Sequence, residues 1–300
     1  MFLAPLDKQY MKMKKIVSVL LSIGLSSSFA QSHFQVHGHR GARGLAPENT
    51  IPAFYEGAKS GADFLELDVV ITKDLKVLVS HEPWLRQAIC ENVKSNKPKD
   101  YNIFNMTVAE VQSYDCGSKF NPDFPEQQKR NVPKPLLSEV IDSIRNYCEV
   151  NKLKLPKLNV EIKCWKSKDG VFQPDPKTFV QLVYGVLKEK DFLDKVLVQS
   201  FDLRVLQELR AIDKAIPQEL LIANLKSVKQ NVKALGYTPT SYSPYFKLVN
   251  KKVIESCHEM GMTIVPWTVN SLEKIQELKA LGVDGVITDY PNLLAEPLKK

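Results

Sequence analysis

Short apolar runs alternate with amphipathic stretches along most of the chain. An apolar run at 34–39 precedes a helical pattern at 50–60, which ends before Gly61. Runs rich in β-branched and apolar residues predict further strands at 64–70, 77–81, 157–163, 196–201, 220–223, 242–246, 263–269 and 285–288. Helical periodicity predicts further helices at 108–114, 137–149, 178–190, 203–212, 225–235, 249–259 and 272–281.

This alternation predicts parallel strands joined by crossover helices. Roughly eight strand units in about 270 residues favour a closed (β/α)8 barrel, the TIM-barrel fold of the α/β class. A doubly wound open sheet is the alternative, although no Gly-x-Gly-x-x-Gly sequence follows a strand. The segment at about 82–135 is polar, weakly periodic and too long for an ordinary loop. We expect it to be a small insertion after the second strand unit, at the barrel mouth; a solvated excursion that only adds surface is the alternative.

Residues 1–30 predict a secretory signal peptide. Three lysines within 12–15 precede an apolar run at 16–25, which is too short for a comfortable membrane span. Ser28 and Ala30 supply the small side chains that signal peptidases require, so cleavage is expected before residue 31. An uncleaved N-terminal anchor is the alternative.

The remaining residues, 31–300, are expected to form a single barrel domain that is exported to the periplasm or secreted. Translation could begin at Met11 or Met13 instead of residue 1. The content of 44% hydrophobic and 25% charged residues is typical of a globular protein. A formal net charge of +7, without a long basic run or a nucleic-acid-binding motif, predicts no nucleic-acid partner. No stable membrane insertion is expected after signal cleavage.

Five cysteines remain, and none belongs to a Cys-x-x-Cys pair, so a zinc site is not expected. Cys90 and Cys116 lie in the same loop-rich segment, and an exported protein can join such a pair by a disulfide. Reduced thiols are the alternative. The odd number leaves at least one cysteine unpaired in either case.

Charged residues stand at predicted strand ends, where barrel enzymes carry their reactive groups. His39 and Arg40 end the first strand, and the planar guanidinium of Arg40 suits phosphate oxygens. His81 ends the run at 77–81, and a positioned imidazole is the usual proton-transfer group near neutral pH. Trp267, late in the run at 263–269, could pack against a substrate or belong to the core.

Three acidic residues occupy otherwise apolar strands. Glu66 and Asp68 are two residues apart, so they project from the same face of their strand. Adjacent buried carboxylates repel each other unless a cation lies between them, and hard oxygen ligands suit Mg²⁺ or Ca²⁺. Glu161 could complete this ligand set, with Lys163 as a point charge for phosphate. Salt bridges are the alternative, including an ion pair between Glu161 and Lys163. Together with two histidines, this set is the equipment for phosphoryl transfer.

These residues belong to a series of short motifs. In chain order they are His39-Arg40-Gly41, Pro47-Glu48-Asn49-Thr50, Glu66-x-Asp68-Val69, Thr72-Lys73-Asp74, His81, Asn159-Val160-Glu161-Ile162-Lys163, Gln199-Ser200-Phe201, Pro266-Trp267-Thr268-Val269 and 285–291. The ordered set resembles the glycerophosphodiester phosphodiesterase family over about 36–291. Three details depart from the family pattern: Glu82 replaces an Asp after the second histidine, Leu75 follows Asp74, and Val70 follows Val69.

The resemblance implies a (β/α)8 barrel that hydrolyses glycerophosphodiesters, such as glycerophosphocholine or glycerophosphoethanolamine, to an alcohol and sn-glycerol 3-phosphate. It implies one divalent cation, Ca²⁺ or Mg²⁺, held by Glu66, Asp68 and Glu161. It also implies His39 and His81 as the acid/base pair, and phosphate contacts from two cations, Arg40 and Lys163. A phospholipase-type phosphodiesterase acting on intact lipid is one alternative. A non-catalytic exported binding protein is the other, and the intact acidic and histidine positions argue against it.

Overall fold

The computed structural model describes residues 33–295, and the predicted signal peptide lies outside them. Eight parallel strands form the barrel, in the order β8-β7-β6-β5-β4-β2-β1-β9. They are β1 (Gln35–Gly38), β2 (Phe64–Ile71), β4 (Lys157–Ile162), β5 (Val196–Ser200), β6 (Gln218–Ile222), β7 (Ser241–Pro244), β8 (Thr263–Ile264) and β9 (Gly285–Thr288). Hydrogen bonds from Asp284 N to Ile264 O (3.0 Å) and from Ile287 N to Pro266 O (2.9 Å) bring the first and last strands of this path together. The predicted barrel is therefore confirmed as a nearly closed one, and the open-sheet alternative is wrong.

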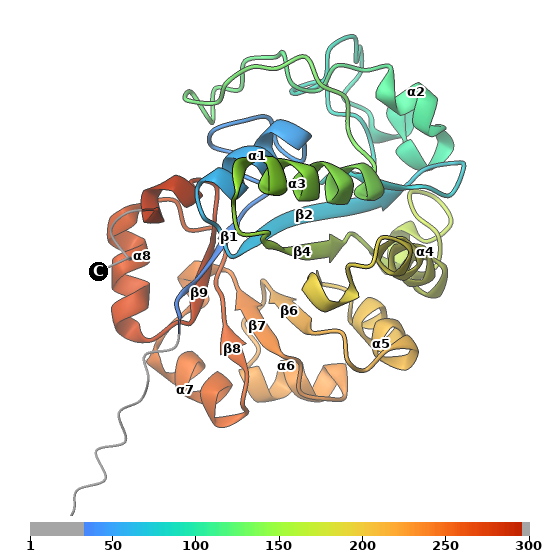
Figure 1. The fold of residues 1–300 in the computed structure, drawn as a ribbon. Coiled ribbons are helices and arrows are strands. Elements are labelled where there is room, and N and C mark those ends of the chain that lie inside the picture. Colours follow the sequence, from blue (N-terminus) through green and yellow to red (C-terminus); the bar gives the residue numbers. More distant parts are fainter. Residues whose placement is uncertain (1–32, 296–300) are drawn as a thin grey trace, which may run out of the picture. The chain divides into compact units, whose positions relative to one another are not determined.

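Helices surround the outside of the strands (Figure 1). They are α1 (Ile51–Lys59), α3 (Leu137–Asn151), α4 (Pro176–Glu189), α5 (Leu203–Ile212), α6 (Val228–Leu235), α7 (Lys251–Glu259) and α8 (Leu272–Leu281). Polar residues cap several of them by accepting a backbone N–H of the first turn, namely Asp175, Asp202, Ser227, Asn250 and Ser271. Within residues 33–295, no helix combines the length and apolar composition that a membrane crossing requires.

The alternation along β2 and β4 explains why acids point into the barrel. Leu65, Leu67 and Val69 of β2 are fully buried in the apolar layer that also holds Ile141 and Ile144 of α3. Since successive side chains of a strand face opposite sides, the residues between them face the barrel interior. The same rule orients β4, where leucine, valine and isoleucine pack outward. The hydrophobic effect at the helix layer thus fixes the orientation of the inward polar residues.

Two predicted strands differ from the structure. The run at 77–81 was counted with the parallel strands, but β3 (Val77–Val79) pairs antiparallel with β2 and lies outside the barrel path. His81 therefore follows a hairpin strand instead of ending a barrel strand. The strand predicted at 263–269 is regular only at its first two residues. Pro266 has no N–H to donate, and parallel pairing with β7 resumes as a bridge between Tyr245 and Trp267.

The segment between β3 and α3, drawn in teal to green in Figure 1, contains little regular structure. It holds two short 3-10 turns, η1 (Pro98–Tyr101) and η2 (Ile103–Asn105), and the one-turn helix α2 (Val108–Gln112). A small core of its own includes Leu85, Ile103 and Val111. The disulfide Cys90–Cys116 joins two parts of this segment, so the predicted bridge is confirmed and reduced thiols are wrong for this pair. The other three cysteines are free and buried, at positions 148, 164 and 257.

Candidate active site

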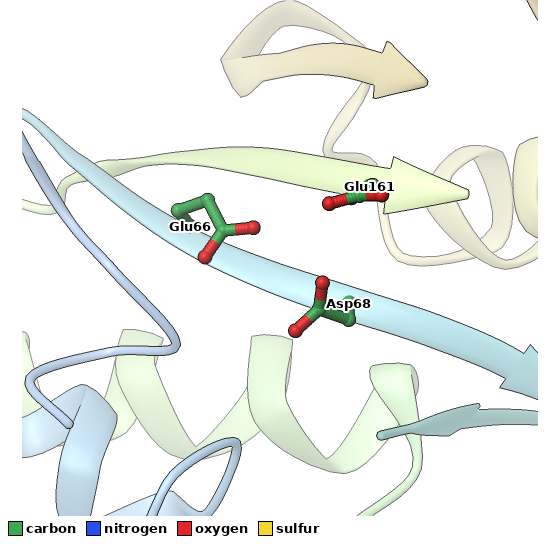
Figure 2. A group of neighbouring side chains, drawn as sticks. All are labelled: Glu66, Asp68 and Glu161. Carbon is green, nitrogen blue, oxygen red and sulfur yellow. The ribbon is translucent and has the colours of Figure 1, made fainter. Parts of the chain in front are cut away.

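Three carboxylates from two neighbouring strands converge at the centre of the site. Asp68 of β2 lies opposite Glu161 of β4 in the strand register, and Glu66 precedes Asp68 on the same face. One oxygen from each of the three lies within 4.8 Å of the others, and all three side chains are buried. Figure 2 shows the three side chains close together, Glu66 and Asp68 on one strand and Glu161 on its neighbour. The acids that the sequence placed on two separate strands are thus brought into one cluster.

The electrostatics of this cluster favour a bound cation. Burial and the charges of Asp68 and Glu161 raise the pKa of Glu66 well above its usual value. Burial also raises the pKa of Glu161. Asp68 differs, because Lys163, His81 and Arg40 together outweigh its burial and hold its pKa well below its usual value. Among the described residues, Asp68 Oδ1 makes no aligned hydrogen bond, although the Lys163 ammonium group lies 3.0 Å away. A buried donor set made only of carboxylate oxygens fits a hard divalent cation.

Two basic residues border the cluster. Lys163 Nζ lies 2.8 Å from Glu161 Oε1 and 3.0 Å from Asp68 Oδ1, the second contact without hydrogen-bond alignment. The ion pair considered as an alternative for Lys163 is therefore present. Arg40 Nη1 donates to Glu48 Oε1 at 2.9 Å, and its backbone N–H donates to Glu66 Oε2 at 2.8 Å. Its Nε, 3.5 Å from Asp68 Oδ2, makes no hydrogen bond within 33–295. Both side chains are buried, yet both line the open cavity described below.

His39 is held by a residue that the sequence analysis did not single out. Its Nδ1 donates to Asp289 Oδ1 at 2.6 Å, while its Nε2 lies 4.0 Å from Glu66 Oε2. Burial lowers the pKa of His39 to about 4, although the Asp289 carboxylate opposes this shift. Asp289 is fully buried, and Arg43 also donates to both of its oxygens. Its place at the end of the last predicted strand, within the motif at 285–291, was the available signal.

His81, like His39, has a carboxylate partner at its Nδ1 atom. Its Nδ1 lies 2.8 Å from Glu82 Oε1, so the glutamate that departs from the family pattern contacts this histidine directly. Arg86 pairs with the same carboxylate at 3.5 Å. His81 is half-buried, with 31% of its side chain exposed. Both histidines are therefore oriented through Nδ1, which leaves each Nε2 available for chemistry.

A cavity of about 600 Å³ joins these groups. Its polar and charged lining includes both histidines, Arg40, Arg43 and Lys163. Its aromatic lining includes Trp165, Phe201 and Trp267. The indole N–H of Trp267 donates to Ser243 O at 2.9 Å, and its ring meets Phe201 edge-on at 5.5 Å. The cavity thus offers charged side chains for an anion and aromatic side chains for the group attached to it.

Two amides support the carboxylates and were also missed as site residues. Asn49 Nδ2 donates to Asp68 Oδ2 at 2.8 Å, and Asn49 Oδ1 accepts the backbone N–H of Asp68. Gln199 Nε2 donates to Glu66 Oε1 at 3.0 Å. Both residues belong to motifs that carried the family resemblance, which was the signal for them. Hydrogen-bonded carboxylates are held in a fixed orientation, as a cation site requires.

The fold and the site together define a class of protein. The barrel brings buried carboxylates, two basic side chains and two oriented histidines into one cavity. This set of groups is typical of an enzyme that cleaves phosphate esters. Comparison with known proteins narrows this class. Residues 39–293 match the model of the glycerophosphoryl diester phosphodiesterase family, and the chain belongs to this family.

Relatives in sequence and in structure agree with this membership. A glycerophosphodiester phosphodiesterase of Bacillus altitudinis is 30% identical over 86% of this chain and 95% of its own length. A solved structure of a Silicibacter pomeroyi protein of this family is 28% identical, with a TM-score of 0.77 over 87% of this chain and 92% of its own. An Oleispira antarctica phosphodiesterase, solved in complex with the product sn-glycerol-3-phosphate, shares the fold at 21% identity. Its TM-score is 0.71 over 89% of this chain and 97% of its own.

Proposed function

We propose that the protein hydrolyses glycerophosphodiesters, such as glycerophosphocholine and glycerophosphoethanolamine, to an alcohol and sn-glycerol 3-phosphate. The observation that carries this proposal is that a buried carboxylate cluster, two basic side chains (Arg40 and Lys163) and two histidines meet in one cavity. Family membership supports the same reaction class. A binding protein without activity would not need both histidines held by buried or half-buried carboxylates.

Glu66, Asp68 and Glu161 would hold one divalent cation, Ca²⁺ or Mg²⁺. Their oxygens suit hard cations, and no cysteine or histidine takes part in this described ligand group. When bound, such a cation polarises a phosphoryl oxygen and lowers the pKa of a hydroxyl group or water beside it. Arg40 and Lys163 would bind the phosphate, because both line the cavity with a cationic group next to the carboxylates. The ammonium group of Lys163 is paired with two of these carboxylates. A cation bound to them would neutralise their charge and would leave this ammonium group free to contact the phosphate.

The two histidines would divide the proton transfers. Burial keeps His39 neutral near pH 7, and Asp289 holds its Nδ1–H, so Nε2 is placed to accept a proton from the nucleophile. His81, half-exposed and paired with Glu82, would protonate the leaving alkoxide. The nucleophile is either water or the glycerol 2-hydroxyl, which would react through a cyclic phosphate. Trp267 would pack against the substrate from the aromatic part of the cavity.

The test is release of sn-glycerol 3-phosphate from glycerophosphocholine, with Ca²⁺ or Mg²⁺ and with EDTA. Glu66→Gln keeps the shape of the side chain but removes its charge, so activity and cation binding should both be lost. Glu56→Gln, at a surface position of α1 that pairs with Lys59, is the matched control and should behave as the parent does. A folded parent protein that releases no product from glycerophosphocholine, -ethanolamine or -glycerol with either ion would refute the proposal.

Intact or partly deacylated lipid is a second candidate substrate, favoured by the aromatic part of the cavity. Trp165 and Phe201 both line the cavity and are 40% and 38% exposed, so their rings could contact an acyl chain. Lysophosphatidylcholine and glycerophosphocholine share a head group and differ in the acyl chain. A higher kcat/KM for the lysolipid, lost on Trp165→Ser, would make the lipid the preferred substrate.

We also propose that the mature enzyme is exported. The lysine-rich start, apolar run and small residues within 1–30 support export, and the Cys90–Cys116 disulfide suits an oxidising compartment. N-terminal sequencing of the protein from the cell envelope or medium should find Gln31 first. Recovery only in the cytosolic fraction, with residues 12–30 retained, would contradict export.

A further inference from the structure

A layer of polar side chains lies inside the barrel next to the carboxylate cluster. Asn159 of β4, Gln199 of β5, Glu219 of β6 and Ser241 of β7 are all fully or almost fully buried. The interior of this fold is usually filled by branched apolar residues, because they pack without leaving polar groups unpaired. Four neighbouring strands that each bury a polar residue here therefore call for a reason beyond packing.

These residues form one hydrogen-bonded chain that ends on the cation site. Ser241 Oγ donates to Glu219 Oε2 at 2.7 Å, and Asn159 Nδ2 donates to Glu219 Oε1 at 2.9 Å. Asn159 Nδ2 also lies 3.3 Å from Gln199 Oε1. Gln199 Nε2 in turn donates to Glu66 Oε1 at 3.0 Å. Glu219 is thereby connected to Glu66 through two amides.

The direction of this chain is set at its far end. When Glu219 is ionised, its carboxylate only accepts hydrogen bonds, so it makes Asn159 turn its NH₂ group inward. That NH₂ group also faces Gln199 Oε1, and the NH₂ group of Gln199 must then face Glu66. The opposite orientation of Gln199 would place its carbonyl oxygen against the Glu66 carboxylate.

The orientation of the Asn159 amide leaves its oxygen without a hydrogen bond, as expected if acceptors around its NH₂ group fix that orientation. Asn159 Oδ1 is buried and has no hydrogen-bond partner among residues 33–295. The same Nδ2 lies 3.2 Å from His37 Nδ1, so three acceptors compete for one NH₂ group. An amide free to choose would turn its oxygen toward a donor, because an unpaired buried oxygen is unfavourable. Of the three acceptors that hold this orientation, Glu219 Oε1 is nearest, at 2.9 Å, and is the carboxylate oxygen.

We propose that Glu219 is a positioning residue of the cation site and acts on the ligand Glu66 through Asn159 and Gln199. This inference rests on the proposed function. Outer groups that orient a metal ligand typically change metal affinity by about 10- to 100-fold when they are removed. Glu219→Leu is therefore expected to weaken Ca²⁺ binding within that range, even though residue 219 does not line the cavity.

The test is isothermal titration with Ca²⁺ on four full-chain proteins: the parent, Glu219→Leu, Gln199→Met and the double variant. Titrations are run at pH 8, because burial raises the pKa of Glu219 to about 7. If Glu219 acts through Gln199, the double variant binds Ca²⁺ no more weakly than Gln199→Met alone. Gln218→Leu is the matched control. The Gln218 side chain is similarly buried on the same strand, but it contacts Tyr237 and takes no part in the hydrogen-bonded series that leads to Glu66.

A purely structural role for Glu219 makes a different prediction. The melting temperature would fall, while the Ca²⁺ dissociation constant of the folded protein would stay unchanged. That result, or additive losses in the double variant, would overturn the inference. Where Glu219→Leu does not fold, the isosteric Glu219→Gln enters the same cycle and must still weaken binding through Gln199. A parent protein that binds neither Ca²⁺ nor Mg²⁺ would instead refute the cation in the proposed function, and the inference with it.

Discussion

Replacing Asp289 by asparagine should test whether the Asp289 carboxylate orients the His39 ring. Asp289 Oδ1 accepts from His39 Nδ1 (2.6 Å) and Arg43 Nε (2.9 Å). Its Oδ2 accepts from Arg43 Nη2 (3.1 Å) and Asn270 Nδ2 (2.6 Å). The asparagine NH₂ group must face one of these donor pairs. At least two of the four hydrogen bonds are therefore lost whichever way the amide turns.

The size of the effect follows from the burial of this carboxylate. Burial opposes its ionisation, but the charges and hydrogen bonds of His39 and Arg43 outweigh burial and hold its pKa well below the usual value. Removing one partner of such a buried pair costs about 3–5 kcal/mol of unfolding free energy. For a domain of this size the melting temperature should fall by roughly 6–20 °C. Loss of an oriented proton acceptor should lower kcat by about 10²- to 10⁴-fold.

The assay is release of sn-glycerol 3-phosphate, measured well below the melting temperature, together with a thermal melt. KM should change less than kcat, because Asp289 does not line the cavity. Asp284→Asn is the matched control. Asp284, at the other end of β9, pairs with His258 at 2.9 Å, and the His258 side chain is 44% exposed, so this pair contributes little. The Asp284 carboxylate also accepts the backbone N–H of Ile264 at 2.8 Å, and the amide oxygen of asparagine can keep that hydrogen bond. An Asp289→Asn protein that is folded and has the parent kcat would refute the orientation of His39 by Asp289.

Two further predictions concern stability. Converting both Cys90 and Cys116 to alanine opens a loop closed over 26 residues and should cost about 3.5 kcal/mol of unfolding free energy, with kcat unchanged; thermal melts test this, and an unchanged melting temperature would contradict it. Arg40 and Arg43 overcome the burial of Glu48 and lower its pKa to about 2. Its contribution of about 3 kcal/mol is therefore present above pH 4.5 and lost as the pH falls toward 2. In urea unfolding, the parent should exceed Glu48→Gln in stability at pH 6 and lose that advantage by pH 2; a constant difference would contradict it.

The local pattern of apolar and polar residues determined most of the helices and strands of this protein. Helix and strand periodicities are short-range properties, so most elements and the barrel itself could be predicted from the sequence. Glu66 and Asp68 were assigned to one strand face for the same reason, since alternation along a strand depends only on neighbouring residues. The approach of Glu161 to this pair followed from barrel topology, because parallel strands carry their carboxyl ends to one rim.

Other features were decided only when the barrel closed. The contact between His39 and Asp289 joins residues 250 positions apart and depends on β9 lying beside β1. The pairing of β3 with β2 follows from a turn and a hairpin, which the apolar run at 77–81 does not distinguish from a parallel strand. Glu219 directly precedes the apolar run predicted as a strand at 220–223, and nothing in the sequence alone marked it as a site residue. Its bond to Asn159 exists because strands far apart in the sequence turn their inward faces toward one axis.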